Sequence, residues 1–294
     1  MNNARVWING RFTDREGAKI SVYDRGFLYG DGVFETMRAY AGVIFRLDAH
    51  LDRLFGSLRL LNIKFPYTRQ YLKKSICRTI QVNGLESAYV RLTVTRGQGS
   101  PGIDCNGPFK ATVIIAANRF IDCPGCSRAR GVRVKTAATR QNEYSPLSGV
   151  KSMNFLQFIL ARSEARKGGF AEAILINTGG YVAEAACANI FLVKNGMILT
   201  PSLESGILPG IARRVVIDMA KALKLKVREK KILLQELMNA DEVFLTNSLI
   251  EILPVTGIDL SKVGSGRPGE ITKLLHISYQ KEVIREVFEA GLRP

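Results

Sequence analysis

Lys151 is a candidate catalytic residue because of its position in the sequence. It lies in the segment 149–154, between a long loop and an apolar helix. Burial at such a junction favours the neutral amine, which can attack a carbonyl carbon. Most lysines near a helix start are nevertheless solvated. The local sequence therefore leaves two interpretations open, a nucleophile and an ordinary surface cation.

Two further segments have the features of anion-binding sites. A Gly/Pro turn leads directly into an amphipathic helix at Gly210, Ile211 and Ala212. The N–H groups of a helix start attract anions, and a glycine lets a phosphate approach the backbone. Pro-Gly also commonly precedes helices that bind no ligand, so a phosphate site and a plain helix start both stay open. A second turn, Thr246-Asn247-Ser248, follows a short strand and could add a hydroxyl and backbone donors.

A carboxylate and an arginine complete the charged candidates. Glu184 lies among small apolar residues beside a strand, where a buried carboxylate needs a positive partner. A protonated pyridine nitrogen would serve, and so would an arginine; the local sequence favours the structural ion pair. Arg53, one turn after His50 on a predicted helix, could hold an anion, but a histidine and an arginine at this spacing usually lie on a helix surface.

The strand predicted over 33–39 presents polar side chains in a defined order. Period-two alternation places Phe34, Thr36 and Arg38 on one face and Glu35 on the other. One face therefore carries an aromatic ring, a hydroxyl and a guanidinium.

The elements that must position these residues fall into two groups. Residues 1–118 predict a small antiparallel α+β domain. It starts with a hairpin turned at Asn9-Gly10, and apolar residues at helical spacing over 47–61 and 68–82 predict two helices. Its other strands are predicted over 33–39, 43–45, 89–95 and 112–117.

Residues 119–131 lack apolar periodicity and predict an interdomain linker, and residues 132–294 predict a larger second domain. Strands and helices alternate irregularly there, unlike a series of βα units. The expected fold class is therefore α/β in the broad, α+β sense, with two domains. The larger domain has predicted strands over 132–138, 172–176, 190–193 and 243–246 and near Val227, helices ending at 168–169, over 211–223 and from 269 on, and a long loop over 139–150.

Composition excludes several classes of protein. Of the 294 residues, 46% are hydrophobic and 23% are charged, as in ordinary globular proteins. No apolar run reaches the ~18–20 residues of a membrane span and the first residues have no signal-peptide core, so a cytoplasmic protein is expected. The five scattered cysteines are not a disulfide framework, and two histidines are too few for a His-rich metal site. Cys123 and Cys126 have the spacing of a redox or zinc pair, but without a second pair we interpret them as two thiols in a loop.

The formal charge of 42 − 26 = +16 suggests an anionic partner. The charge is evenly distributed, since residues 1–118 contribute 17 − 9 = +8 and the rest contribute the other +8. The densest basic run, residues 221–231, contains no aromatic residue for base stacking and is better explained as a solvated face. Neither nucleic acid nor a membrane is expected as a partner.

Together these segments resemble the class IV aminotransferases. These are the pyridoxal-phosphate enzymes of fold type IV, which include branched-chain and D-amino-acid aminotransferases and aminodeoxychorismate lyases. The resemblance extends over nearly the whole chain and includes the segments 29–35 and 46–54. The family signature of a glutamate, an asparagine with an aromatic residue, a threonine and a Gly-hydrophobic-x-basic turn reads Glu184…Asn189-Ile190-Phe191…Thr200…Gly210-Ile211-Ala212-Arg213.

The resemblance implies a role for each candidate. Lys151 would form a Schiff base with the cofactor and shuttle the substrate proton, and Glu184 would pair with the pyridinium nitrogen. The phosphate would be bound by Arg53, Gly210, Ile211, Ala212, Asn247 and Ser248. The substrate would be lined by Tyr29, Phe34, Thr36, Arg38, Arg91 and Arg140. No metal is expected.

The resemblance is greatest to the branched-chain group, which implies transamination of L-leucine, L-isoleucine and L-valine with 2-oxoglutarate. Thr36 stands where that group has glycine and where the lyases have a hydroxyl, so aminodeoxychorismate lyase, which forms 4-aminobenzoate and pyruvate, is the alternative. A D-amino-acid or broad-specificity enzyme is another, although loop 95–102 lacks the Arg-x-His with which D-specific members hold the substrate carboxylate. The family usually forms homodimers, so a homodimer or a larger oligomer is expected. The presence of both Lys151 and Glu184 argues against a non-catalytic scaffold.

Overall fold

The computed structural model describes residues 4–99, 102–105, 107–121 and 128–291. The chain divides into two compact units. The N-terminal unit contains Met1–Ile121 together with Val150–Asn154 and Arg285–Pro294, and the C-terminal unit contains Asp122–Gly149 and Phe155–Ile284. Lys151 therefore belongs to the N-terminal unit, although it is distant from that unit in sequence. Cys123 and Cys126 lie outside the described residues.

The N-terminal unit is built on a six-stranded antiparallel sheet, with the strand order β2-β1-β6-β5-β3-β4. The predicted first hairpin is confirmed, and both of its turn residues, Asn9 and Gly10, have the positive φ that a type I′ turn needs. The strands are β1 Arg5–Ile8, β2 Arg11–Asp14, β3 Gly32–Tyr40, β4 Val43–Ile44, β5 Ala88–Gln98 and β6 Lys110–Arg119; the helices are α1 Arg25–Tyr29, α2 Leu47–Leu60 and α3 Arg69–Val82.

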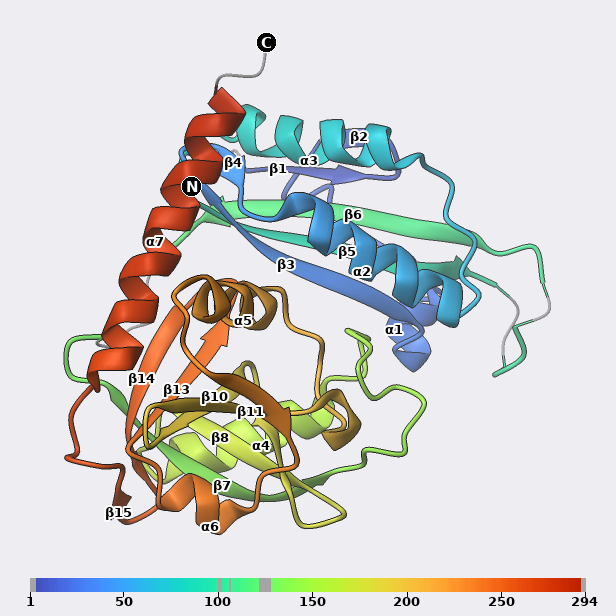
Figure 1. Cartoon of the computed structure of the whole chain (residues 1–294). Helices are drawn as coiled ribbons and strands as arrows, with labels where there is room; N and C mark the ends of the chain where they lie inside the picture. The colour runs from blue at the N-terminus through green and yellow to red at the C-terminus, as the bar shows by residue number, and fades with distance from the viewer. Residues whose placement is uncertain (1–3, 100–101, 106, 122–127, 292–294) are drawn as a thin grey trace. The chain divides into compact units, whose positions relative to one another are not determined.

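Helices α2 and α3 lie along this sheet and cover one of its faces (Figure 1). The apolar stripe of α2 packs there against alternate residues of β3, so that Leu51, Leu54 and Met37 are almost completely buried. Because side chains alternate along a strand, Phe34, Thr36 and Arg38 occupy the opposite face. The strand thus separates a buried face from a polar one, as its sequence predicts.

The C-terminal unit contains a mixed nine-stranded sheet. Its order is β12-β11-β10-β13-β14-β7-β8-β9, with β15 paired to β14, and β12-β11, β14-β7 and β7-β8 are parallel pairs. The strands are β7 Val132–Gln141, β8 Glu172–Asn177, β9 Val182–Ala185, β10 Asn189–Lys194, β11 Met197–Pro201, β12 Val227–Lys230, β13 Glu242–Asn247, β14 Glu251–Ile258 and β15 Ser261–Lys262; the helices are α4 Leu156–Lys167, the 3₁₀ turn η1 Leu203–Ser205, α5 Ile211–Ala222, α6 Leu234–Met238 and α7 Glu270–Gly291.

One strand of this sheet is longer than expected. β7 continues to Gln141, so Arg140 is a strand residue and the prediction that the loop begins at residue 139 is wrong. The extension is stabilised by pairing with β8, because Arg140 lies opposite Ile176 in the parallel register. Polar side chains in this stretch gave no alternation from which the pairing could be predicted.

Helices α4 and α5 pack on different strands of the sheet (Figure 1), α4 on β7 and β8, and α5 on β12 and β13. Phe191 of β10 stacks on Phe244 of β13, with ring centroids 4.9 Å apart. Asn189 and Thr246 are register partners two residues further along the same strands. Alternation therefore places Asn189 and Thr246 on the face that carries this aromatic pair.

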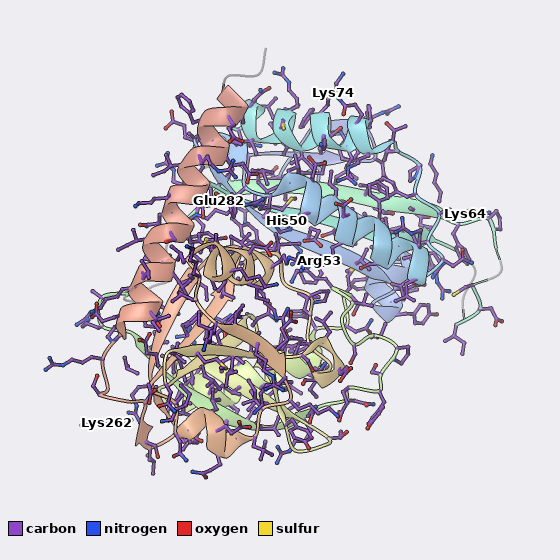
Figure 2. All side chains as sticks on the ribbon, in the orientation of Figure 1. His50, Arg53, Lys64, Lys74, Lys262 and Glu282 are labelled. Carbon is purple, nitrogen blue, oxygen red and sulfur yellow. The ribbon has the colours of Figure 1, made fainter. Side chains whose placement is uncertain are left out.

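The basic run 221–231 includes β12, which lies at the edge of the sheet. Arg228 is exposed on this strand, and Lys226 is exposed directly before it. Charged side chains on an edge strand oppose pairing with another sheet, so these residues have a structural explanation. Other lysines, such as Lys64, Lys74 and Lys262, extend from the outer surface of their own units (Figure 2). Within the described residues, no helix is both long and apolar enough to cross a membrane.

Candidate active site

Lys151 is fixed to the start of β3 by main-chain hydrogen bonds. Its carbonyl accepts the N–H of Phe34 at 3.0 Å, and the N–H of Met153 donates to the Gly32 carbonyl at 2.9 Å. The Lys151 Nζ lies 4.6 Å from the centroid of the Phe34 ring. The lysine thus occupies an extended segment held against a strand, and helix α4 begins only five residues later, at Leu156.

Arg53, on α2, is oriented by Glu35, a buried carboxylate of β3. Its Nε donates to Glu35 Oε1 at 2.8 Å and its Nη2 donates to Oε2 at 2.7 Å, a two-pronged pair that fixes the plane of the guanidinium. His50 Nδ1 lies 2.7 Å from the same Oε2. Burial raises the pKa of Glu35, but the arginine and the histidine outweigh burial and hold that pKa at about 2. Figure 2 shows His50 and Arg53 on α2.

The expectation that His50 and Arg53 form an ordinary surface pair is wrong. His50 is 1% exposed, and the Arg53 side chain is 10% exposed. The sequence does contain a signal for this arrangement: alternation places Glu35 on the helix-covered face between apolar neighbours, where an ionised carboxylate needs cations. A helix packed on that face has to supply them.

The two histidines should make the protein sensitive to mild acid. Burial lowers the pKa of His50, so the folded protein holds it neutral, and burial also lowers the pKa of His276. The unfolded chain protonates these groups near pH 6.5, so stability should fall below that pH by up to about 1.4 kcal/mol per pH unit for each histidine. Glu35 adds to the loss at lower pH, because its contribution is complete above 4.5 and disappears as the pH falls through about 2.

Urea unfolding at pH 7 and pH 5 measures this effect. The variants His50→Gln and His276→Gln should each reduce the loss of stability between the two pH values. The chain contains no other histidine, so the double variant should be nearly insensitive. A double variant with the wild-type pH dependence would show that other groups are responsible.

The polar face of the N-terminal sheet brings four predicted substrate residues together. Thr36 lies opposite Arg91 in the register of β3 and β5. The Arg91 guanidinium carbon is 3.8 Å from the Phe34 ring centroid, and that of Arg38 is 3.9 Å from the Phe120 ring. Two cations and a hydroxyl therefore share a face with the ring beside Lys151.

The other two predicted substrate residues are placed elsewhere. Tyr29 ends α1 in the N-terminal unit, where its hydroxyl accepts the N–H of Gly102 at 3.1 Å. Arg140 belongs to β7 of the C-terminal unit.

In the C-terminal unit, Glu184 is a buried carboxylate oriented by amides. It is 8% exposed on β9, and it accepts the Asn189 side-chain N–H and the Leu208 main-chain N–H, both at 3.1 Å. Asn189 also donates to the Leu208 carbonyl at 2.9 Å. A Cβ at Gly210 would lie 1.9 Å from Asn189 Oδ1, so only glycine permits this approach. Gly210 thus leaves space for the Asn189 side-chain amide, which donates to Glu184.

Helix α5 begins directly after this glycine. Its N-cap residue is Gly210, so no side chain caps the first N–H groups of the helix. The first turn, with Ile211 and Ala212, therefore combines backbone donors with the positive end of the helix dipole. Arg213 faces away into the structure, where it donates to the Pro201 carbonyl at 2.9 Å.

The turn at Asn247-Ser248 is held by the Asn247 side chain. Its Oδ1 accepts the N–H groups of Leu249 and Ile250 at 2.8 and 2.9 Å, and its Nδ2 donates to the Cys187 carbonyl at 2.8 Å. The preceding hydroxyl of Thr246 is buried and has no hydrogen-bond partner among the described residues. The sequence places Thr246 in the same turn as Asn247 and Ser248; the structure places it inside β13, next to the end of that strand.

Among the described residues, no group of three or more His, Cys, Asp and Glu side chains could hold a metal ion. The candidate site residues of the two units are instead a lysine, arginines, a buried carboxylate and backbone donors. Lysine, arginine and backbone N–H groups donate hydrogen bonds to anions, and a buried carboxylate accepts one from a protonated nitrogen.

The chain belongs to the class IV amino-transferase family, whose model matches residues 32–258. It is 42% identical over 272 residues to a putative branched-chain-amino-acid aminotransferase of Methanocaldococcus jannaschii. The aligned region covers 92% of this chain and 93% of the relative. It is 33% identical to the aminodeoxychorismate lyase of Bacillus subtilis, over 98% of each chain. D-alanine aminotransferases of Listeria species match as well.

Among solved structures, the branched-chain amino acid aminotransferase of Escherichia coli superposes with a TM-score of 0.92 at 31% identity, over 96% of this chain and 94% of that one. The fold is therefore fold type IV of the pyridoxal-phosphate enzymes, and the resemblance seen in the sequence is confirmed. Class IV aminotransferases depend on pyridoxal phosphate.

Proposed function

We propose that this aminotransferase binds pyridoxal phosphate through Lys151 and transfers amino groups between L-branched-chain amino acids and 2-oxoglutarate. The observation that carries the proposal is the attachment of the Lys151 segment to β3. The same strand carries Glu35, which orients Arg53. A lysine nucleophile and an arginine that can hold a phosphate are thereby fixed to one rigid element.

The residues present suit each part of the cofactor. The phosphate would be held by Arg53, by the first turn of α5 and by Asn247 and Ser248. The buried Thr246 hydroxyl and the uncapped start of α5 leave polar groups for which a phosphate or its water would be a suitable partner. Glu184 would accept the ring N–H. A solved branched-chain amino acid aminotransferase that is 32% identical to this chain contains pyridoxamine 5'-phosphate.

The chemistry of the site would be divided between the cofactor and the protein. When bound, pyridoxal phosphate withdraws electrons from the substrate and makes its Cα proton acidic. Lys151 would hold the cofactor and carry that proton, so no histidine is needed for the proton transfer. Glu184, oriented by two amide donors, would pair with the protonated ring nitrogen. Arg38 and Arg91 would hold the carboxylates of the substrates.

The choice of substrate depends on the polar face of β3. Phe34 supplies apolar surface for an aliphatic side chain, and the nearby Arg91 supplies positive charge for the second carboxylate of 2-oxoglutarate. This combination, with the similarity to the M. jannaschii relative, supports branched-chain transamination. Thr36 supports a second candidate, aminodeoxychorismate lyase, because its hydroxyl shares this face and could move a proton during the release of pyruvate.

Single-turnover experiments with the holoenzyme test these assignments. Mixing with L-leucine or L-valine should change the absorbance of the bound cofactor, and 2-oxoglutarate should restore it. D-Alanine should produce no comparable change. If only aminodeoxychorismate reacts, with release of pyruvate, the enzyme is a lyase. A reaction with D-alanine alone would assign it to the D-specific group.

We also propose that the protein is a cytoplasmic homodimer. Leu156, Ile159 and Leu160 have the i, i+3, i+4 spacing of one helix face on α4 and are 67%, 57% and 58% exposed in the single chain. Apolar side chains at this spacing form a surface that a second copy would cover. The mass of the protein in solution, measured by light scattering, distinguishes a dimer from a monomer or a larger oligomer.

A further inference from the structure

Glu251 has an unusual backbone conformation at a buried place in the C-terminal unit. Its φ is +60°, in the left-handed region, and it is only 4% exposed. A non-glycine residue is strained in that region unless its surroundings hold it there. Among the described residues, the other non-glycine positions with positive φ are all at least partly exposed: Asn9, Ala41, Arg46, Asn62, Asn195, Lys224 and Asp259.

The strained residue closes the turn that contains Ser248. Glu251 begins β14 and lies opposite Asn247, the last residue of β13, so the connecting loop has only the three residues 248–250. Short hairpin connections commonly close with a left-handed residue, for which glycine is best suited. A glutamate in this position indicates that contacts of its side chain stabilise the left-handed conformation.

The Glu251 carboxylate lies between basic groups from two distant segments. Arg128 Nη2 is 4.0 Å from Glu251 Oε2 and also donates to the Ile250 carbonyl at 3.1 Å. His276 Nδ1, on α7, is 3.8 Å from the same Oε2. Arg128 thus contacts two consecutive residues at the end of the loop.

Helix α7, which carries His276, is anchored at its start by a residue other than Glu251. The N-terminus of α7 is fixed to β13 by Glu242, which accepts the N–H groups of Ile271 and Thr272 at 3.1 and 2.8 Å. His276 Nδ1 is buried without a hydrogen-bond partner among the described residues. Burial lowers the pKa of His276, so near neutral pH Arg128 supplies the positive charge.

We propose that Glu251 is a positioning residue for phosphate binding. Its carboxylate, paired with Arg128, keeps residue 251 left-handed and thereby fixes the loop 248–250 in the conformation that presents Ser248 to the phosphate. This inference rests on the proposed function, because it takes Asn247 and Ser248 as part of the phosphate site. Glu251 itself touches neither cofactor nor substrate; it acts through the loop.

The test compares two ligands that differ only in the phosphate. The full-length protein is equilibrated with pyridoxal phosphate or with pyridoxal, and the bound fraction is measured by absorbance. In Glu251→Gln and in Arg128→Gln, the dissociation constant for pyridoxal phosphate should rise roughly tenfold, whereas that for pyridoxal should change less than about twofold. A merely structural role would weaken both ligands alike.

Glycine substitutions separate the carboxylate from the backbone strain. Glu251→Gly removes the carboxylate but also the strain, so residue 251 can stay left-handed without its side chain, and the phosphate-specific loss should be smaller than that of Glu251→Gln. Lys224→Gly is the matched control, since Lys224 has a φ of +59° and is exposed; it should bind both ligands as the wild type does. If Glu251→Gly fails to fold, Arg128→Gln still provides the test, because the Arg128 side chain is 28% exposed.

The outcomes distinguish the two proposals. If the wild type binds pyridoxal phosphate and the Glu251 and Arg128 variants keep the wild-type ratio of the two dissociation constants, the inference about Glu251 is wrong and the proposed function stands. An equal weakening of both ligands also overturns it. If the wild type binds neither compound, the proposed function fails, and the inference fails with it.

Discussion

Replacing Lys151 with alanine should reduce transamination by at least about 10³-fold. The side chain is proposed to do two things, to hold the cofactor and to carry the substrate proton, and alanine removes both. The fold should survive, because the segment is attached to β3 through the Lys151 carbonyl and the Met153 N–H rather than through the lysine side chain. Steady-state kinetics with L-leucine and 2-oxoglutarate measure the loss, and circular dichroism checks the fold.

Lys151→Arg is the informative companion variant. It places a long basic side chain beside the Phe34 ring, but a guanidinium stays protonated at neutral pH and cannot act as a base. It should therefore be nearly as inactive as the alanine variant. Lys64→Ala, an exposed lysine of the same unit, should keep wild-type activity. Borohydride reduction followed by peptide mass analysis should label Lys151 in the wild type; labelling of another lysine, or more than about a tenth of the activity in Lys151→Ala, would contradict the assignment.

The sequence predicted the elements whose apolar pattern is simple. The alternation of β3 and the leucine spacing of α2 predict both the strand and the helix, and burial of Met37 and Leu54 agrees with those patterns. The hairpin at Asn9-Gly10 is predicted because few dipeptides tolerate two positive φ values. Such signals are local, so a single sequence contains them.

Contacts between distant segments could not be predicted in the same way. The attachment of Lys151 to β3 joins residues more than a hundred positions apart, and nothing in segment 149–154 indicates which strand it will meet. The environment of Glu35 was predictable in part: alternation shows that it faces a helix, but not that His50 and Arg53 are the residues that meet it.

Backbone conformation was the least predictable property of the site. The left-handed Glu251 has no sequence signal, since glycine or asparagine is the usual residue there. The hydrogen bonds of Asn247 to Leu249 and Ile250 form a compact local turn, but the sequence does not reveal that the closing residue is strained. The local sequence indicated donors in this turn, and the family resemblance assigned Asn247 and Ser248 to the phosphate, but neither revealed the geometry of the turn.

Removing the Glu35 carboxylate should produce the largest loss of stability. Glu35→Leu leaves the Arg53 guanidinium, only 10% exposed, without its two-pronged partner, and should destabilise the protein by about 3–5 kcal/mol. Glu35→Gln keeps an oxygen for one hydrogen bond but loses the charge, so its cost should be smaller, about 2 kcal/mol. Urea unfolding at one fixed cofactor concentration measures both, because a bound ligand adds to the apparent stability.

A double-mutant cycle assigns that loss to the Glu35–Arg53 pair. Arg53→Gln alone leaves the carboxylate buried beside His50, whereas the double variant Glu35→Gln, Arg53→Gln removes both charges. The coupling energy between the two sites should therefore be at least about 2 kcal/mol. Asp52→Asn is the matched control, since Asp52 lies next to Arg53 on α2 and its ion pair with Arg69 is exposed; it should cost no more than about 1 kcal/mol. A coupling energy as small as the cost of Asp52→Asn would mean that packing around β3, and not the buried carboxylate, holds Arg53 in place.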